Sequence, residues 1–346
     1  MSLFYFLRVT CVPEKFRGFV TDDRDRIFAI LELSRDAQQL GIVPNYELST
    51  EDLYVNVARA LLLRRRRFRV LSLCQKNKKY SRLPSWVPDW SSLAGPELAW
   101  PHVGDVMEEC PCYDDFTPSK GLDLRDFPVQ SKDQRRLRLH ALMVDFVEST
   151  GKSYSQIAAQ VIPDREPNRL PCAQRSWILA LASLQRNYRQ KRLNKVCEDH
   201  NNAEEQAVID RKRLFITAFA DRGLTDMALE EYDIPRPSTC IIAEQFFEDS
   251  LVEDEDAWIC SLYAWYIERA AQCRRPFITS RGYIGIGPTN VAVGHQIAII
   301  VGADVPFVLE ESNDKSWRLI GESYVNGIMY GEEARDSARV QEIEIH

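Results

Sequence analysis

The carboxyl-terminal part of the chain, residues 276–346, alternates turn residues with short runs of β-branched side chains, and this pattern restricts the fold more than any other feature. Residues 297–301 read Ile-Ala-Ile-Ile-Val, a run typical of a strand buried on at least one face. Apolar runs at 307–309 and 317–320 flank a polar turn, which predicts a β-hairpin. The punctuating residues are Gly282, Gly285, Gly287, Pro288, Gly294 and Gly302. We predict a small antiparallel sheet or a partly open barrel here.

The rest of the chain is predicted to be mainly helical, apart from one strand. Residues 136–149 alternate apolar and polar side chains at their start and predict that strand. Residues 1–20 carry no clear signal. Apolar spacing and start signals predict helices at about 21–34, 49–64, 171–188, 203–222 and 257–267. The predicted fold class is therefore α+β, with helical segments packed against the small C-terminal antiparallel β-sheet or partly open barrel.

Changes in composition divide the chain into four regions. Residues 1–95 hold the first helices, and residues 96–135, rich in Pro, Gly, Asp and Ser, are interpreted as an irregular linker. Residues 136–275 combine the predicted strand with further helices, and residues 276–346 form the glycine-rich β module. At roughly 150 residues per domain, the length corresponds to about two folding units.

Charge and composition exclude several classes of function. The net charge of −7 disfavours nucleic acid and anionic membranes as partners, and no apolar run reaches the ~18 residues that cross a bilayer. Nine cysteines without a CxxC pair indicate reduced thiols rather than a disulfide framework. Cys110 and Cys112 have only one residue between them, which is a poor spacing for zinc ligands. We expect a cytoplasmic protein without a bound metal or cofactor.

Residues 83–90, Leu-Pro-Ser-Trp-Val-Pro-Asp-Trp, combine two prolines with two tryptophans. The prolines prevent a regular helix, so we predict an extended segment. Tryptophan buries a large area and needs a partner for its N–H group. We therefore interpret Trp86 and Trp90 as core anchors, and an aromatic cage for a ligand is the alternative.

Four further groups of residues have both a structural and a functional interpretation. The glycines of 282–287 could form a nucleotide loop, but a β-rich run rather than a helix follows them, which favours strand turns. The arginines of 64–67 are interpreted as a solvated helix end rather than a nucleic-acid patch. The acidic residues of 248–256 lack the alternating ligands of a calcium loop. His295 and Asp304 accompany no nucleophile elbow, so no catalytic triad is predicted.

Three separated blocks resemble the pattern of fungal heterokaryon-incompatibility (HET) proteins. Residues 21–31, TDDRDRIFAIL, are similar to the family segment DPRDKIYALLGL, with Asp23 in place of proline. Residues 83–90 match LPSWVPDW. In the third block, residues 281–288 (RGYIGIGP) resemble GRLGLGP, and residues 319–332 (LIGESYVNGIMYGE) resemble LVGEAYVHGIMxGE.

Two departures from the family pattern lie in the third block. Residues 293–297 resemble PGDxI with His295 in place of aspartate, and residues 306–310 resemble PFVLR with Glu310 in place of arginine. The family-motif residues, which we interpret as structural, are Asp25, Trp86, Pro88, Asp89, Trp90, Gly285, Gly287, Pro288, Gly294, Pro306, Gly321, Glu322, Tyr324, Gly327 and Gly331. The segments that define the HET core, SYxWG and WID…CINQ…ER, are absent. We therefore expect a C-terminal portion that lacks this core.

The resemblance implies a non-enzymatic regulatory or scaffold portion of an HET-type protein. Such a portion would act in fungal self/non-self recognition and cell-death signalling through protein partners, and the family pattern carries no catalytic residue onto this sequence. Two alternatives remain. One is an enzyme with a site between the helical part and the β module, and the other is a truncated, inactive relative.

Overall fold

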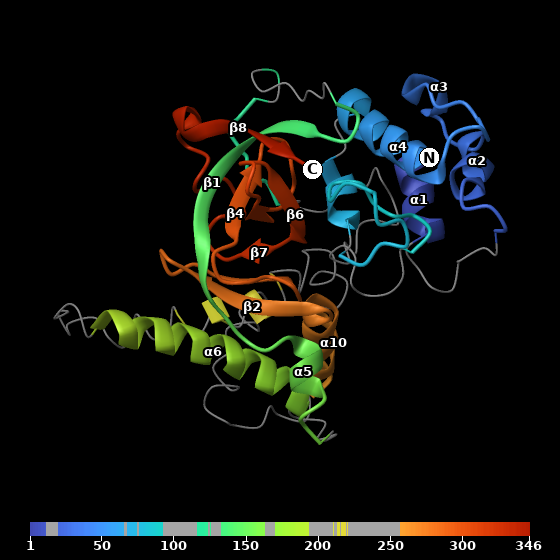
Figure 1. The fold of residues 1–346 in the computed structure, drawn as a ribbon. Helices are drawn as coiled ribbons and strands as arrows, with labels where there is room; N and C mark the ends of the chain where they lie inside the picture. Colours follow the sequence, from blue (N-terminus) through green and yellow to red (C-terminus); the bar gives the residue numbers. More distant parts are fainter. Residues whose placement is uncertain are drawn as a thin grey trace.

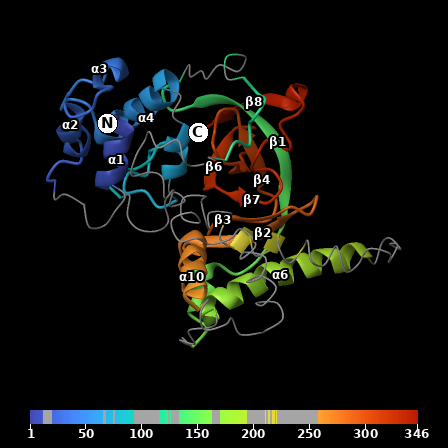
Figure 2. The same cartoon turned by 180° about the vertical axis from the view of Figure 1, so that it is seen from behind.

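The computed structural model describes residues 1–11, 20–65, 68–74, 76–92, 116–123, 125, 133–162, 170–193, 210, 213–214, 216–218, 220 and 257–346. The fold of this part of the chain is α+β, as predicted, with an eight-stranded and mostly antiparallel sheet. Helices from the start of the chain cover one side of the β structure, and later helices lie beyond another side (Figures 1 and 2). In both views the C-terminus lies between the first helices and the β structure.

The first helical region packs around one long helix. Its elements are α1 (Leu3–Cys11), α2 (Asp25–Leu31), α3 (Ala37–Leu40), α4 (Thr50–Arg65) and the 3-10 helix η2 (Phe68–Leu73). Both α2 and α4 lie where helices were predicted, and the N–H of Asp52 donates to Ser49 Oγ at 3.0 Å as the start signal indicated. The sequence left α1 unassigned, although Leu3 and Leu7 lie one turn apart and are fully buried.

The strands form a ring that one strand extends into a second sheet. They are β1 (Leu137–Thr150), β2 (Arg274–Thr279), β3 (Ile284–Pro288), β4 (Gln296–Ile300), β5 (Phe307–Glu311), β6 (Trp317–Glu322), β7 (Tyr324–Val325) and β8 (Val340–Ile345). The strand order is β4-β5-β6-β8-β1-β2-β3-β7, and an additional β4–β1 pairing closes the first five into a barrel-like ring. The end of β1 continues into the second sheet, which β2, β3 and β7 complete. The predicted hairpin is β5–β6, and the predicted strands at 136–149 and 297–301 are β1 and β4.

The long strand β1 belongs to both parts of the sheet. Its first half pairs with β8 and β4, and its end pairs with β2, where Val147 lies opposite Thr279. The register shifts between Met143 and Asp145 and again between Val147 and Ser149. Such bulges bend a strand and increase its twist, and β1 forms a long arc around the ring in Figure 1. The sheet therefore extends well beyond residues 276–346.

The later helices pack near the second sheet. They are α5 (Tyr154–Ala158), α6 (Cys172–Leu193) and α10 (Ala257–Ala271), and a 3-10 turn, η6 (Ser337–Arg339), precedes β8. A capping box at Ser153 begins α5, since the Ser153 hydroxyl accepts from the Gln156 N–H and the Gln156 side chain accepts from the Ser153 N–H. Of the helix predicted at 203–222, the described residues 210, 213–214 and 216–218 are helical, and the rest lies outside the described residues.

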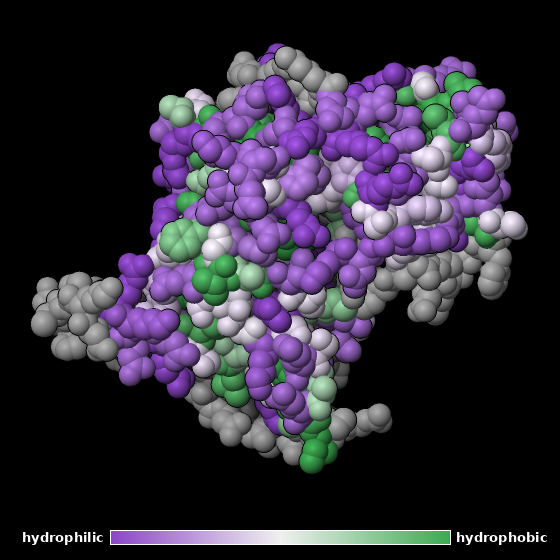
Figure 3. Space-filling model, viewed as in Figure 1, coloured by the Kyte–Doolittle hydropathy of each residue, from purple (hydrophilic) through white to green (hydrophobic). Residues whose placement is uncertain are grey.

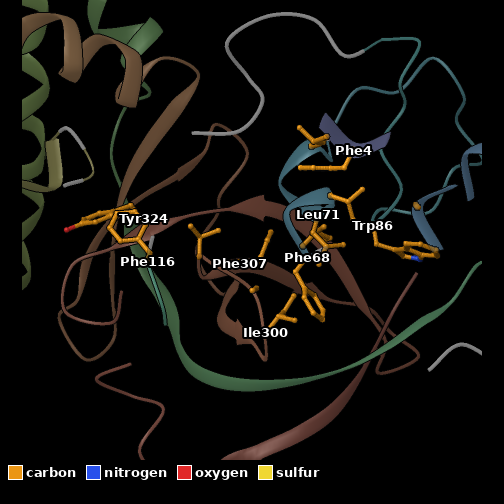
Figure 4. Packing of buried hydrophobic residues seen from close by; sticks show 14 of the residues in the cluster. Phe4, Phe68, Leu71, Trp86, Phe116, Ile300, Phe307 and Tyr324 are labelled. Carbon is orange, nitrogen blue, oxygen red and sulfur yellow. The ribbon is translucent and has the colours of Figure 1, made fainter. Parts of the chain in front are cut away.

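One apolar cluster joins the first helices to the inside of the ring. Figure 4 follows it from Trp86, past Phe4 and Leu71, to Phe307 and Tyr324. All five side chains are at most 5% exposed, so the helices and the ring share a core. A smaller cluster lies between the ring and the second sheet and includes Leu142, Phe277, Ile297, Val308 and Val325.

Candidate functional site

The segment 83–90 lies where the first helices meet the ring, and its aromatic rings are buried. Trp86 is 0% exposed, and its indole N–H donates to the carbonyl of Arg135 at 3.1 Å. Trp90 is 1% exposed and packs edge-on against Tyr54, with ring centroids 5.1 Å apart. The Trp90 N–H is buried without a hydrogen-bond partner in the described part of the chain. Neither ring is open to a ligand in this arrangement, and Pro88 between them is also buried.

Ser85 connects this segment to two strands of the ring. Its N–H donates to the carbonyl of His346 at 2.9 Å, and its hydroxyl donates to the same oxygen. The N–H of Leu319 in β6 donates to Ser85 Oγ at 2.9 Å. His346 directly follows β8, so one serine ties the segment to β6 and to the end of β8. We call these contacts the serine seam.

A single lysine holds the backbone of the segment. The ammonium of Lys78 donates to the carbonyls of Pro84 at 2.5 Å, Ser85 at 3.2 Å and Val87 at 2.7 Å. Burial is the largest cause that lowers the pKa of Lys78, to about 8. These three acceptors use all three protons of the ammonium group, which gives Lys78 a structural role.

Two aspartates connect the first two family blocks. Asp89 is fully buried, and its carboxylate accepts from the N–H groups of Tyr80 at 3.1 Å and Ser91 at 3.0 Å. Asp23 stands where the family pattern has proline, and it accepts from the Tyr80 hydroxyl at 2.7 Å and from Lys79 at 2.5 Å. The substitution therefore adds polar contacts between the α2 region and residues 79–80, just before the segment.

Asp25, the motif residue of the first block, bonds within the helical region. Its carboxylate accepts from the hydroxyl of Tyr46 at 2.5 Å. Arg24 beside it donates to the carbonyl of Leu48 at 2.8 Å. These bonds fix the loop between α3 and α4 against the start of α2, at a distance from the serine seam.

The motif residues of the third block lie inside or beside the second sheet. Gly285 lies in β3, where a Cβ atom would come within 2.6 Å of the Tyr324 carbonyl and 2.7 Å of the Phe277 ring. Gly321 has a φ of +147°, and a Cβ atom there would come within 2.7 Å of the Pro288 ring. The lack of room for a Cβ atom explains why glycine stands at these two positions, and no phosphate-binding role is needed. Gly287 is also in β3, and the motif glycines at positive φ in loops are Gly294, Gly327 and Gly331.

A buried ion pair joins β6 to β2. Glu322 Oε1 lies 2.8 Å from Arg274 Nη2, and both side chains are at most 5% exposed. Next to it, the N–H of Ser323 donates to the carbonyl of the motif residue Pro306 at 2.8 Å. A buried pair of this kind is costly to break because it leaves one uncompensated charge.

The residues considered for other sites are not brought together. His295 lies 3.9 Å from Glu310, whereas Asp304 pairs with Arg69, so they form no dyad. Burial is the main cause that lowers the pKa of His295 below its ordinary value of 6.5. Arg64 donates to the carbonyl of Leu40 at 2.6 Å, at the end of α3. Residues 66–67, the acidic residues of 248–256 and the cysteine pair at 110–112 lie outside the described residues.

Clefts lie at two separate places in the described part of the chain. One, of about 680 Å³, opens beside the serine seam between residues 76–85, residues 133–136 and β6. The other, of about 840 Å³, lies between the end of β1, α5 and α6. The first cleft occupies the place that the enzyme alternative specified, between the helical part and the β module.

The described residues place further limits on the site. They contain no group of three or more His, Cys, Asp and Glu side chains that could hold a metal ion. No helix among them combines the length and apolar character of a bilayer span. The face shown in Figure 3 is mostly hydrophilic, with apolar residues in small separate groups.

Comparison with known proteins agrees with the family resemblance. Residues 252–343 match the Het-6 beta-barrel domain family, a range that contains β2 to β7 and most of β8 but not β1. The chain is 24% identical over 372 aligned positions to Heterokaryon incompatibility protein 6, OR allele, of Neurospora crassa. The match covers 92% of this chain and 50% of that protein, so the chain spans about half the length of this relative. No solved structure matches the chain.

Proposed function

We propose that this heterokaryon-incompatibility-type protein is a non-enzymatic regulatory and scaffold region that acts in fungal self/non-self recognition. In this proposal it works in the cytoplasm through protein partners and adjusts a cell-death signal. The support is the similarity to Heterokaryon incompatibility protein 6 over 92% of the chain, together with a fold whose family-motif residues serve packing and connection.

The observation that carries the proposal is the serine seam. The segment 83–90 follows the helices of the first block, and Ser85 bonds it to both β6 and the residue after β8. Lys78 holds the same segment through three carbonyls. In this proposal a change in position at either end shifts the other end, because the hydrogen bonds of the seam would otherwise be lost.

The enzyme alternative depends on the cleft beside this seam. A catalytic lysine needs a lowered pKa and a free electron pair. Lys78 has the lowered pKa, but its ammonium group donates to three backbone carbonyls. We therefore favour the structural role for Lys78, and Lys78→Arg separates the two. Arginine still donates hydrogen bonds but has no titratable amine at neutral pH.

The test is a forced heterokaryon between two auxotrophic strains of the source fungus that carry different alleles at this locus. With wild-type alleles we expect slow growth of the unlike pair and normal growth of the like pair. Ser85→Ala and Lys78→Met should restore growth of the unlike pair at equal protein level, because the seam no longer transmits position. Ser183→Ala, an exposed serine on α6, is the matched control and should leave the slow growth unchanged.

Two results would contradict the proposal. Normal growth of the unlike wild-type pair would remove any role of this locus in incompatibility. Loss of the phenotype in Lys78→Arg, with normal protein level and thermal stability, would favour an enzyme with a titrating amine at position 78.

A further inference from the structure

The cleft beside the serine seam carries a large excess of positive charge. Six of its described lining residues are cationic, and Asp133 is the one carboxylate side chain among them. The cationic residues are Lys76, Lys78, Arg82, Arg135, Arg136 and Arg318. The chain as a whole has a net charge of −7, so this local excess runs against the overall balance. Clefts lined by one sign of charge concentrate counter-ions of the opposite sign.

The cations at the mouth of the cleft are exposed, and the ion pairs that they form are weak. Arg82 is 81% exposed and lies 3.4 Å from Glu51, and Arg318 is 52% exposed and lies 3.8 Å from Glu310. Lys76 is exposed on the same rim. Exposed pairs at such distances contribute little, so these side chains can turn to a ligand at small cost.

Two further arginines are held more firmly. Arg135 pairs with Asp52 at 2.9 Å, and Arg136 pairs with Asp314 at 3.0 Å and Glu344 at 2.7 Å. These carboxylates hold both guanidinium groups in the cleft wall. The wall is therefore built by contacts between separate parts of the chain, before any ligand arrives.

Two cations of the cleft, Lys78 and Arg318, repel each other. Burial lowers the pKa of Lys78, and the charge of Arg318 contributes to the same direction as a smaller cause. These two cations come from different elements, the loop before residue 83 and strand β6. An anion placed between them would offset their repulsion and bring these elements closer.

The rest of the lining is apolar or neutral. Leu83, Pro84, Leu319 and Ile320 contribute apolar surface, while amide groups stand in the same lining at Asn77 and Asn290. A volume of about 680 Å³ is within the range of small-molecule sites. Apolar surface with a few amide groups suits a flat ring, and the cations suit several negative charges.

We propose that this cleft binds a small molecule that carries two or more phosphate groups, with the phosphates against Arg82, Arg318 and Lys76. Several charges spread over three segments match a polyphosphate better than a single carboxylate, since arginine binds phosphate through paired N–H groups. The bound molecule bridges the loop before residue 83 and β6, and so tightens the serine seam. The binding is independent of the proposed function, whereas its regulatory effect rests on it.

The test is calorimetric titration of the full chain with inorganic tripolyphosphate and, separately, with ATP, at about 0.15 M salt. We expect saturable binding of at least one of them. The double variant Arg82→Gln/Arg318→Gln should weaken it by about tenfold or more, because two charge-assisted contacts are lost. Arg186→Gln/Lys191→Gln removes the same charge from the exposed face of α6 and should leave the affinity unchanged.

The two probes also distinguish the parts of the ligand that the cleft recognises. Tighter binding of ATP supports a ring on the apolar surface, and equal binding supports recognition of phosphate alone. Absence of saturable binding, or equal loss of affinity in both double variants, would overturn the proposal. Heterokaryon growth of strains that carry Arg82→Gln/Arg318→Gln tests the regulatory effect separately. If the proposed function is wrong, the binding result is unaffected.

Discussion

Two contacts between the β structure and the rest of the described chain are built differently: the serine seam on the ring, and the α5–α6 region beside the second sheet. At the serine seam, side chains donate to and accept from backbone groups of β6 and of the residue after β8. Beside the second sheet, α5 and α6 pack against each other through aromatic rings, and the Tyr188 hydroxyl of α6 donates to the carbonyl of Ser280 at 2.9 Å. Trp177 is 0% exposed and packs edge-on against Tyr154 at 5.7 Å. Gly151 there allows close approach, since a Cβ would lie 2.8 Å from Pro276.

The difference concerns what each contact can tolerate. Hydrogen bonds to backbone groups require one position and one orientation, and a buried group that loses its partner costs about 1–3 kcal/mol. Apolar contacts depend on volume and accept swaps of similar size. We therefore expect the serine seam to fix relative position and the α5–α6 contact to supply stability.

The largest expected effect is the loss of either buried tryptophan. Trp86→Ala and Trp177→Ala should each reduce the free energy of unfolding by about 3–5 kcal/mol, because each leaves a large cavity. Urea denaturation followed by circular dichroism measures both. The matched control is Trp265→Ala on α10, which is 43% exposed and should cost far less.

Substituting phenylalanine for Trp86 and for Trp177 separates the loss of volume from the loss of the indole hydrogen bond. Phenylalanine keeps most of the volume but removes the indole N–H, which donates to the carbonyl of Arg135 in one case and of Ala218 in the other. A cost near zero for Trp86→Ala would refute its role as an anchor.

A second prediction tests the seam itself. Ser85→Ala leaves the N–H of Leu319 without its acceptor and should cost about 1–3 kcal/mol. Ser85→Thr keeps the hydroxyl and should cost less, provided that the added methyl group fits. Ser183→Ala on α6 should have no measurable effect in the same denaturation experiment. Equal costs for Ser85→Ala and Ser183→Ala would mean that the seam contributes nothing to stability.

A third prediction concerns a pair of side chains within the ring, which serves as a reference because it joins no helix to the ring. His295 and Glu310 stand where the family pattern has aspartate and arginine, and they lie 3.9 Å apart. His295→Asp alone places two carboxylates together and should cost up to about 1 kcal/mol. The double variant His295→Asp/Glu310→Arg should recover most of that loss. An additive double-mutant cycle would show that the two positions are not coupled.

The smallest predicted effect is a pH dependence from the same histidine. Burial lowers the pKa of His295 below 6.5, while Glu310 raises it and Arg318 lowers it further. The unfolded chain then binds a proton more readily than the folded chain. The contribution of His295 to stability is therefore complete above pH 6.5 and falls as the pH drops through its folded pKa. His295→Gln should flatten the unfolding free energy across this range, and an unchanged slope would exclude this histidine as its cause.

Local patterns in the sequence predicted the position of several elements and whether each is a helix or a strand. Apolar spacing indicated α2, α4 and α6, and an apolar run after acidic residues indicated α10. Alternation indicated β1, and two apolar runs on either side of a polar turn indicated the β5–β6 hairpin. Such patterns report on one face of one element, which is why they need no knowledge of the partner. The helix α1 was missed because its nine residues offer few polar positions to mark an exposed face. The cationic lining of the cleft was also missed, since its cations lie in three separate segments.

The sequence by itself determined the family resemblance, the α+β class and the non-helical character of residues 83–90. The prediction of an extended conformation there was wrong: the segment forms turns, and the N–H of Val87 donates to the carbonyl of Pro84 at 3.1 Å. Only the tertiary structure decided that β1 closes the ring with strands more than a hundred residues later, and that Ser85 bonds to the residue after β8. Pairing between strands depends on backbone groups, which every residue carries and which leave no mark in composition. Partners of that kind become known only when the chain is folded.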